Sequence, residues 1–336
     1  MKLKIVLFII LGFFTLQSNA QDPVFTQYSL VPETLNPGFT GFQYNWRAGL
    51  IHRRQWPDGN RVMDTDYGFL NKMIGEHAGL GITILNHREA FTNYNYLQIN
   101  AAYSYKVEFD YEWSFRPGLE VGYGSKSYNF DNLLLEDQIN SGTGAISGSS
   151  MDSGIYNQKE NINFLDISAG FLIDNEKGWF GASLKHINRP NISFVNGGNA
   201  PLDLFLTIHG GYAFDIDGTP SMLLPENTKL LFTANYMRQS QFNRLDIGSA
   251  LKFEDLIFGA TAALNPERKS DNSHFVTSIN PYVSFHFSNF TFGYSYDLST
   301  SKLGHTQGIH ELSLTWQLRF CETCIAKVNN YYDYNK

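Results

Sequence analysis

Residues 310–320 read His-Glu-Leu-Ser-Leu-Thr-Trp-Gln-Leu-Arg-Phe, and apolar and polar side chains alternate without a break from Glu311 to Phe320. Successive side chains of a strand point to opposite faces, so this stretch predicts a strand with two unlike faces. The apolar face carries Leu312, Leu314, Trp316, Leu318 and Phe320. The polar face carries Glu311, Ser313, Thr315, Gln317 and Arg319. With lipid on the first face and a lumen on the second, this is one strand of a transmembrane β-barrel.

Thirteen further segments show the same two-residue period, which makes fourteen predicted strands. We place them at 45–56, 62–70, 78–88, 92–107, 110–126, 161–174, 178–188, 203–215, 228–239, 242–254, 256–264, 273–287, 289–297 and 309–320. A soluble sandwich would also bury one face of each strand. The strands are long and even in number, however, and no second class of element remains to cover the apolar face. The sequence therefore predicts an all-β fold, an antiparallel transmembrane β-barrel of about 14 strands with an N-terminal non-strand segment.

The first twenty residues have the features of an export signal. Lys2 and Lys4 precede an apolar run at 5–16 that is too short for a spanning helix, and Ser18-Asn19-Ala20 is a small-residue cleavage site. No later stretch is apolar for long enough to form a membrane helix, so a membrane-spanning chain has to be a barrel. We expect a signal peptide at 1–20, a luminal or periplasmic segment at 21–44, an outer-membrane barrel at 45–320 and a periplasmic tail at 321–336.

The connections between predicted strands are of two kinds. Bacterial barrels have short periplasmic turns and longer outer loops, with both termini in the periplasm. On that rule strand 45–56 runs outward, and most long connections are outer, including 127–160, 189–202, 265–272 and 298–308. The inner connection 216–227 is an exception to the rule. Loop 127–160 is the longest and contains the apolar run Leu133–Leu135, which we interpret either as part of a surface loop or as a plug.

Composition excludes one class of partner and favours the membrane. The formal net charge is -7, and removal of Lys2 and Lys4 with the signal leaves 23 basic against 32 acidic residues, or -9. This charge argues against nucleic-acid binding. Aromatic residues make up 15% of the chain, with 27 Phe and 19 Tyr, as expected where rings line both membrane interfaces.

Three local patterns suggest chemistry, and each has a simpler interpretation. Gly122–Lys126 resembles a phosphate-binding glycine loop but has no following helix, so we interpret it as part of a strand. Asp215–Gly218 lacks the later ligands of a calcium loop and is interpreted as a turn. Glu112 and Glu120 share a predicted strand face with Arg116, where lumen ion pairs are expected more often than acid–base catalysis.

The sequence predicts no catalytic, cofactor-binding or metal-binding residues. Nine His residues are scattered, and neither a zinc-protease motif nor a nucleophile elbow occurs. Cys321 and Cys324 follow the last predicted strand. In an oxidising periplasm they form a candidate disulfide, and paired thiols that serve a partner are the second interpretation.

Two proline-containing motifs and the end of the first strand carry a family resemblance. The first motif contains Asp22, Pro23, Phe25, Gln27 and Tyr28. The second contains Asn36, Pro37, Gly38 and Gly41. The first predicted strand then ends with Arg54, Gln55 and Trp56. Together they resemble the PorP/SprF family of the type IX secretion system of Bacteroidota, and the likeness runs from Gln21 to about Phe320.

The resemblance implies a non-enzymatic outer-membrane component of the type IX secretion and gliding apparatus of a Gram-negative cell. Its partners would be membrane lipid, a secreted surface protein with a C-terminal sorting domain, and periplasmic components of the machine. The family often stops at the Phe of its last strand, whereas this chain continues through a tail, 321–336. The alternative function is that of a porin or hydrophobic-solute channel, and an outer-membrane enzyme is a third, weaker interpretation.

Proline gives the N-terminal motifs a structural consequence. Pro23 and Pro37 cannot donate to a strand ladder, so the segment they occupy should not be a barrel strand. Our hypothesis is that it lies in the lumen or beneath the barrel, with Phe25, Tyr28 and Phe39 packed there.

Overall fold

The computed structural model describes residues 22–43, 45–57, 62–109, 112–128, 136–140, 142–143, 145–146, 158–216, 228–267, 274–300 and 308–318. Within these ranges, no helix has the length and hydropathy needed to cross a membrane. The predicted signal peptide, Leu133–Leu135, Gly218, Cys321, Cys324 and the predicted tail lie outside the described residues.

Strands account for nearly all of the regular structure. They are β1 (Arg47–Gln55), β2 (Met63–Ile74), β3 (Ala78–Glu89), β4 (Tyr94–Tyr105), β5 (Val107–Glu108), β6 (Ser114–Ser127), β7 (Asn161–Asp174), β8 (Gly178–Lys185), β9 (Phe205–Asp215), β10 (Lys229–Gln239), β11 (Phe242–Phe253), β12 (Leu256–Leu264), β13 (Val276–Phe287), β14 (Phe290–Ser299) and β15 (Ile309–Gln317). The helical elements described are three 3-10 turns, η1 (Pro32–Thr34), η2 (Pro37–Phe39) and η4 (Glu136–Gln138).

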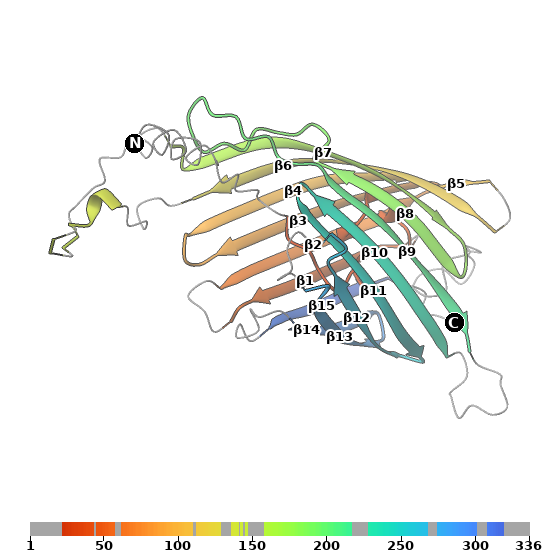
Figure 1. The fold of residues 1–336 in the computed structure, drawn as a ribbon. Helices are drawn as coiled ribbons and strands as arrows, with labels where there is room; N and C mark the ends of the chain where they lie inside the picture. Colours follow the sequence, from red (N-terminus) through yellow and green to blue (C-terminus); the bar gives the residue numbers. More distant parts are fainter. Residues whose placement is uncertain are drawn as a thin grey trace, which may run out of the picture.

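Antiparallel pairing closes the sheet into a ring (Figure 1). Each long strand pairs with the long strands before and after it, and β1 pairs with β15 over the whole of β1, from Arg47 opposite Gln317 to Gln55 opposite Ile309. β5 is a two-residue addition that pairs only with the start of β6, while β4 itself pairs with β6. The predicted closed barrel of fourteen strands is therefore confirmed, with one extra short strand.

The two faces of each strand have the predicted environments. In β15, Leu312 is 57% exposed, whereas the neighbouring Glu311 is fully buried. The same division holds around the ring, where large apolar side chains are exposed on the outer surface and polar ones are buried in the interior. An exterior that is apolar and an interior that is polar is the arrangement of a barrel surrounded by lipid.

The largest difference between a predicted and an observed strand start is at β6. We predict a strand from residue 110, but β6 begins at Ser114, and the amide of Phe109 donates to the carbonyl of Trp113 at 3.3 Å. Glu112 therefore precedes the strand and is exposed, so it does not share a strand face with Glu120. The alternation of apolar and polar residues continues on both sides of Ser114, so it does not mark where the strand begins.

The connections separate the barrel into a loop end and a turn end. Residues 128–160, 186–204, 265–275 and 300–308 connect strands at the loop end. At the turn end, 75–77, 175–177, 254–255 and 288–289 make short hairpins. Glu254 and Ser288 have φ of 48° and 57°, the left-handed conformation that two-residue hairpin turns require.

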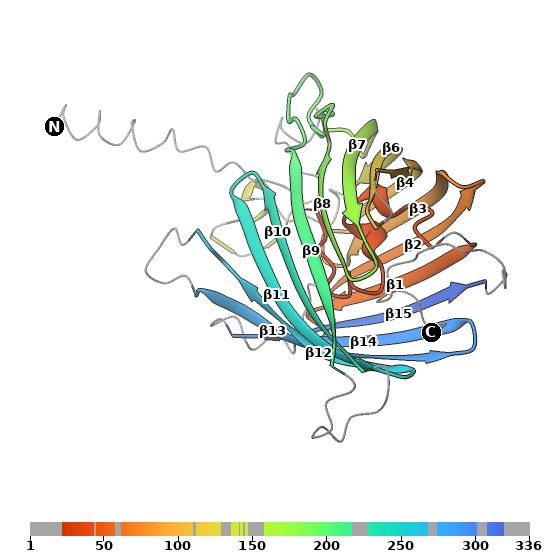
Figure 2. The same ribbon diagram turned by 90° about the vertical axis from the view of Figure 1, so that its right-hand side faces the viewer.

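The lumen contains the N-terminal residues 22–43, which we call the luminal segment. Figure 2 shows this red segment surrounded by the strands of the ring. Near the turn end, Phe39 and Phe42 of the luminal segment join a buried apolar cluster with inward side chains of the wall, including Leu172, Leu231 and Ile257. The lumen thus contains a large apolar cluster near the turn end, and polar side chains together with a smaller apolar cluster of Tyr96, Phe164 and Leu202 toward the loop end.

Candidate functional site: the luminal segment and its polar wall

The luminal segment runs from the loop end to the turn end of the barrel. Its first described residue, Asp22, donates its amide to Oε1 of Gln239, the last residue of β10 at the loop end, at 2.8 Å. At the other extreme, Gln43 accepts from the side chain of Gln317 at 3.2 Å, at the turn end of β15. The rule for barrel termini places residue 22 at the periplasmic end. The structure differs, because the chain crosses the lumen before β1 begins.

A charged histidine holds Asp22 at the loop end. His186, directly after β8, lies with Nε2 2.6 Å from Oδ2 of Asp22 and Nδ1 2.9 Å from Oδ2 of Asp166. Burial alone would lower the pKa of His186, but the charge of Asp22 and hydrogen bonds to both carboxylates raise it to about 9. Although burial opposes it, the imidazolium charge in turn holds the pKa of Asp22 well below its usual value.

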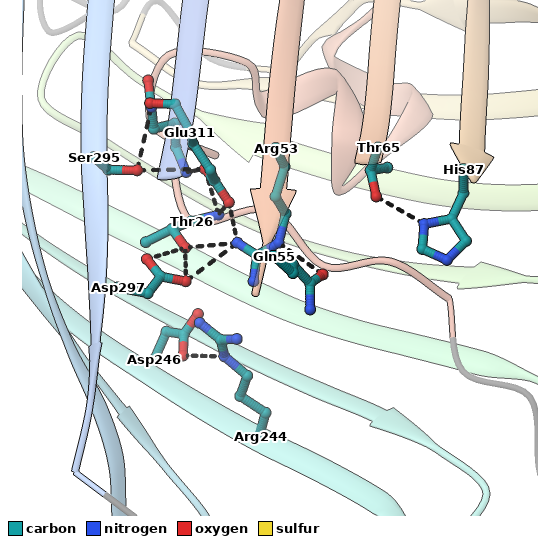
Figure 3. A network of polar contacts seen from close by, with 11 residues as sticks. Thr26, Arg53, Gln55, Thr65, His87, Arg244, Asp246, Ser295, Asp297 and Glu311 are labelled. Carbon is teal, nitrogen blue, oxygen red and sulfur yellow. Dashed lines mark hydrogen bonds and ion pairs between the residues drawn. The ribbon is translucent and has the colours of Figure 1, made fainter. Parts of the chain in front are cut away.

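An ion-pair network of Arg53, Asp297 and Glu311 holds Thr26 and Gln27 of the luminal segment (Figure 3). The amide of Thr26 donates to both oxygens of Glu311, at 2.9 and 3.0 Å, and the amide of Gln27 donates to Oε2 at 3.0 Å. The hydroxyl of Thr26 donates to Asp297 at 2.9 Å. Arg53 pairs with both carboxylates, so one guanidinium partly balances two buried negative charges.

Gln27 is bound at both ends of its amide. Its Nε2 donates to the carbonyl of Glu311 at 2.9 Å and to Ser295 at 3.2 Å, and its Oε1 accepts from Ser313 at 2.6 Å. A carboxylate could not donate, and a shorter amide would not reach both strands. The β14–β15 wall therefore selects glutamine at this position.

A second ion pair ties the middle of the segment to the start of the barrel. Glu33 pairs with Arg47, the first residue of β1, and its Oε1 also accepts from Asn71 at 2.9 Å. Arg47 in addition donates to the carbonyl of Leu30 at 2.5 Å and lies over the ring of Phe69, 4.8 Å from its centroid.

The asparagine–proline–glycine motif docks on the ladder of two neighbouring strands. Asn36 Nδ2 donates to the carbonyls of Phe171 in β7 and Ala182 in β8, at 2.8 and 3.1 Å. Its Oδ1 accepts from the amide of Gly38 at 2.8 Å and so caps η2. Pro37 is the first residue of this turn, where its missing N–H costs nothing.

Glycines in the wall make the close approach of the segment feasible. A Cβ on Gly118 would lie 2.4 Å from the amide nitrogen of Gly38, and one on Gly79 would lie 2.1 Å from the carbonyl oxygen of Thr40. Gly170 would meet Oδ1 of Asn36 at 2.3 Å. The first two contacts are with backbone and the third is with a side chain, so a Cβ at any of these positions would force the luminal segment to move.

The structure brings nine of the predicted family-motif residues together in the lumen. They are Asp22, Pro23, Phe25, Gln27, Tyr28, Asn36, Pro37, Gly38 and Gly41. The remaining three lie at the end of β1 or just after it, and they take no part in the contacts described above. Arg54 points outward and pairs with Asp64 at 2.8 Å, Gln55 accepts from Arg53 at 3.2 Å, and Trp56 lies one residue beyond β1.

Sequence reasoning missed the partners that hold the segment. Arg53, rather than Arg54, faces the lumen, and the alternation within β1 could have shown this. Alternation places Glu311 on the polar face of its strand, but no local pattern pairs it with Thr26. His186 gave no signal, because its two carboxylates come from distant parts of the chain.

The other candidate motifs have structural roles. Lys126, at the end of the glycine-rich stretch that we interpret as part of a strand, lies in β6 with its ammonium 4.6 Å from the ring centroid of Tyr96. Arg116 pairs with Asp174 at 3.0 Å. Asp215 ends β9 and pairs with Lys177 at 3.4 Å. In the described part of the chain, no three His, Cys, Asp or Glu residues gather in a group that could hold a metal ion.

A closed antiparallel barrel with an apolar exterior and an internal N-terminal segment is an outer-membrane β-barrel protein. The chain belongs to the family described as type IX secretion system membrane protein PorP/SprF, whose model matches residues 17–316. No curated protein sequence matches it.

Several solved outer-membrane barrels are similar in fold. The outer membrane protein Omp33 of Acinetobacter baumannii is 8% identical, with 83% of this chain and 100% of that chain covered and a TM-score of 0.43. A FadL homologue of Pseudomonas aeruginosa is 9% identical, with 84% and 92% covered and a TM-score of 0.44. The toluene transporter TodX of P. putida is 9% identical, with 85% and 93% covered and a TM-score of 0.45. These weak likenesses concern the barrel alone.

Proposed function

We propose that this protein is a non-enzymatic receptor of the type IX secretion machinery, which binds a partner and helps to secrete it or anchor it at the outer membrane. The partner is a secreted surface protein with a C-terminal sorting domain or a periplasmic component of the machine. Family membership supports the secretion role, and the outer membrane is where a barrel of this family lies.

The observation that carries the proposal is the occupied lumen. Residues 22–43 are held along their length by side chains of the wall, and apolar residues fill the turn end. A barrel filled in this way is a rigid scaffold, and recognition on rigid scaffolds belongs to loops. This arrangement favours binding over passive transport.

The loop end offers a built surface for such a partner. Gln158 and Val195 form an isolated bridge, and Lys159 donates its amide to Phe194 at 2.7 Å, so connections 128–160 and 186–204 are joined. Phe194 packs on Tyr128, with ring centroids 6.0 Å apart. Ile187 and Val195 remain exposed on this surface. Contiguous exposed apolar patches mark protein-binding sites, and in our proposal the partner covers these residues.

Co-purification with crosslink mapping tests the proposal. The tagged protein is isolated from its native outer membrane after crosslinking, and we expect crosslinks from 186–204 to a protein with a C-terminal sorting domain, or from turn-end residues to a periplasmic component. Val195→Asp should reduce a loop-end complex at least tenfold, whereas Glu176→Arg, at the turn end, should leave it unchanged. Absence of crosslinked type IX partners at both ends, with the barrel folded, would refute the proposed role.

A further inference from the structure

Five ionisable side chains gather on the outer surface of β1, β2 and β3, on the face that elsewhere meets lipid. They are His52, Arg54, Asp64, Asp66 and Arg88, which we call the outer charged cluster. Each strand turns alternate residues inward, and Arg53 and Thr65, which adjoin cluster members in sequence, are buried in the lumen. The cluster therefore lies outside the barrel and takes no part in holding the luminal segment.

The cluster shortens the apolar belt of the barrel on these strands. A transmembrane strand needs about 9 to 11 residues. The outward residues of β4 are apolar throughout 97–105, and those of β13 throughout 279–287, so both strands meet this requirement. On β1 the apolar outer face ends at Leu50, because His52 and Arg54 take the next two outward positions. Charged side chains thus occupy part of the height that lipid covers elsewhere.

Apolar residues flank the cluster on both sides at its own level. The row of the ladder that contains His52 and Asp66 continues to Leu312 in β15, which is 57% exposed. In the other direction the same row passes through Asn86 to the outward residue Leu97 in β4. Charged side chains on the lipid face destabilise a barrel, and the more so toward the middle of the membrane. A polar surface is therefore a better neighbour for this part of the ring than lipid.

The ion pairs within the cluster leave part of its hydrogen-bonding capacity unused. Arg54 donates to Asp64 from Nε at 2.8 Å and from Nη2 at 3.0 Å, while its Nη1 has no partner among the described residues. The side chain of Arg88 is 61% exposed and comes only to 3.6 Å from Asp66. His52 lies with Nδ1 2.7 Å from the same carboxylate. A neighbour that approaches β1–β3 therefore meets both donors and acceptors.

We propose that the outer charged cluster is the contact between two copies of this protein that lie side by side in the outer membrane. Two arginines and two aspartates give it equal numbers of both signs, which suits a surface of the same kind better than an anionic lipid headgroup. A two-fold contact brings the same patch of both subunits together.

The register of β1 and β2 makes the cluster complementary to itself. Arg54 lies directly opposite Asp64 across this ladder, and His52 lies opposite Asp66. A two-fold axis that runs between β1 and β2, parallel to the barrel axis, exchanges the two strands. Arg54 of each copy then faces Asp64 of the other, and His52 faces Asp66, so that opposite groups meet twice over.

Charge reversal distinguishes a contact between copies from any other use of the cluster. Arg54→Asp and Asp64→Arg each place like charges across the proposed axis, so either variant alone should lose the dimer. Co-expression of the two variants under different tags should restore it, because each reversed charge then faces its opposite in the other copy. Neither a bound lipid nor an unlike protein would give this restoration.

Native mass spectrometry of the full protein in nanodiscs of its own membrane lipid counts the copies, and heat-modifiable migration shows that each variant is folded. We expect wild-type dimers, at least tenfold fewer dimers for each single variant, and dimers that carry both tags in the co-expressed pair. Arg238→Asp is the matched control, because Arg238 is as exposed as Arg54 and pairs with Glu267 at 3.4 Å on a distant strand, and it should keep the wild-type dimers.

Three results would overturn the proposal. The first is a wild-type protein that stays single, whether bare, bound to lipopolysaccharide or joined to a different membrane protein. The second is a dimer that neither charge reversal weakens. The third is a co-expressed pair of folded variants that does not recover the dimer.

Discussion

Two carboxylates on neighbouring strands, Asp297 and Glu311, share one guanidinium and also accept from Thr26 and Gln27 of the luminal segment. Such a network is strong only while every member is present, because each lost partner leaves a charge or donor buried. Single residues therefore decide how firmly the segment is held.

Glu311→Gln should destabilise the barrel by about 3 kcal/mol, the lower end of the cost of breaking a buried ion pair, because Asp297 still pairs with Arg53. The new amide would also turn N–H groups toward the backbone N–H of Thr26 or Gln27. Urea unfolding in lipid vesicles, followed by tryptophan fluorescence, measures the change. Glu112→Gln is the exposed control, and equal stability of the two variants would contradict this role.

The His186 contact should give stability a distinct pH dependence. Because folding raises the pKa of His186 from 6.5 to about 9, its contribution is complete below pH 6.5 and is lost as the pH rises through 9. Protease protection of residues 22–28 should fall between pH 6.5 and 9.5 in the wild-type protein. His186→Gln should already be less protected at pH 6.5 and show a flatter profile, and a profile identical to wild type would disprove the assignment.

At the scale of elements, the luminal segment and the strands are two separate units with complementary shape and hydrogen-bonding groups. The strands close on each other through their ladders, while the segment adds no strand and is bound through caps, ion pairs and glycine contacts. A substitution that disrupts the contacts between them should therefore release the segment before it opens the barrel.

Gly79→Ala tests this separation. Its Cβ would meet the carbonyl of Thr40 at 2.1 Å, so the segment has to move, with a cost of about 1–3 kcal/mol for overpacking. We expect faster hydrogen exchange in residues 36–43 and an intact, heat-modifiable barrel. Gly68→Ala is the matched control, because the nearest atom is a side-chain methyl of Ile84 at 3.2 Å. Unchanged exchange in Gly79→Ala would show that the contact does not fix the segment.

At the scale of the whole molecule, the filled lumen predicts a barrel without steady conductance. In planar bilayers the wild-type protein should produce no stable open channel. Deletion of 22–43, which removes both the contacts with Asp297 and Glu311 and the apolar side chains of Phe39 and Phe42 at the turn end, should raise the conductance markedly. A steady wild-type pore would favour the porin or solute-channel alternative over the receptor.

Much of the barrel was predictable because its signal is local. Alternation along each strand placed all fourteen long strands, although it set the start of β6 at residue 110 instead of Ser114 and the end of β2 at residue 70 instead of Ile74. The candidate site was predictable in part. Pro23 and Pro37 showed that the N-terminal residues are not strands, but no local pattern indicates what they contact. Thr26 and Glu311 are 285 positions apart.

By itself, the sequence determined the strands, their two faces and the family, because a two-residue period and short motifs are properties of neighbouring residues. The tertiary structure alone decided that residues 22–43 cross the lumen, that Asp22 lies at the loop end, and which of the inward carboxylates are paired. Those facts depend on closure of the ring, which brings distant polar side chains out of water and requires each to find a partner.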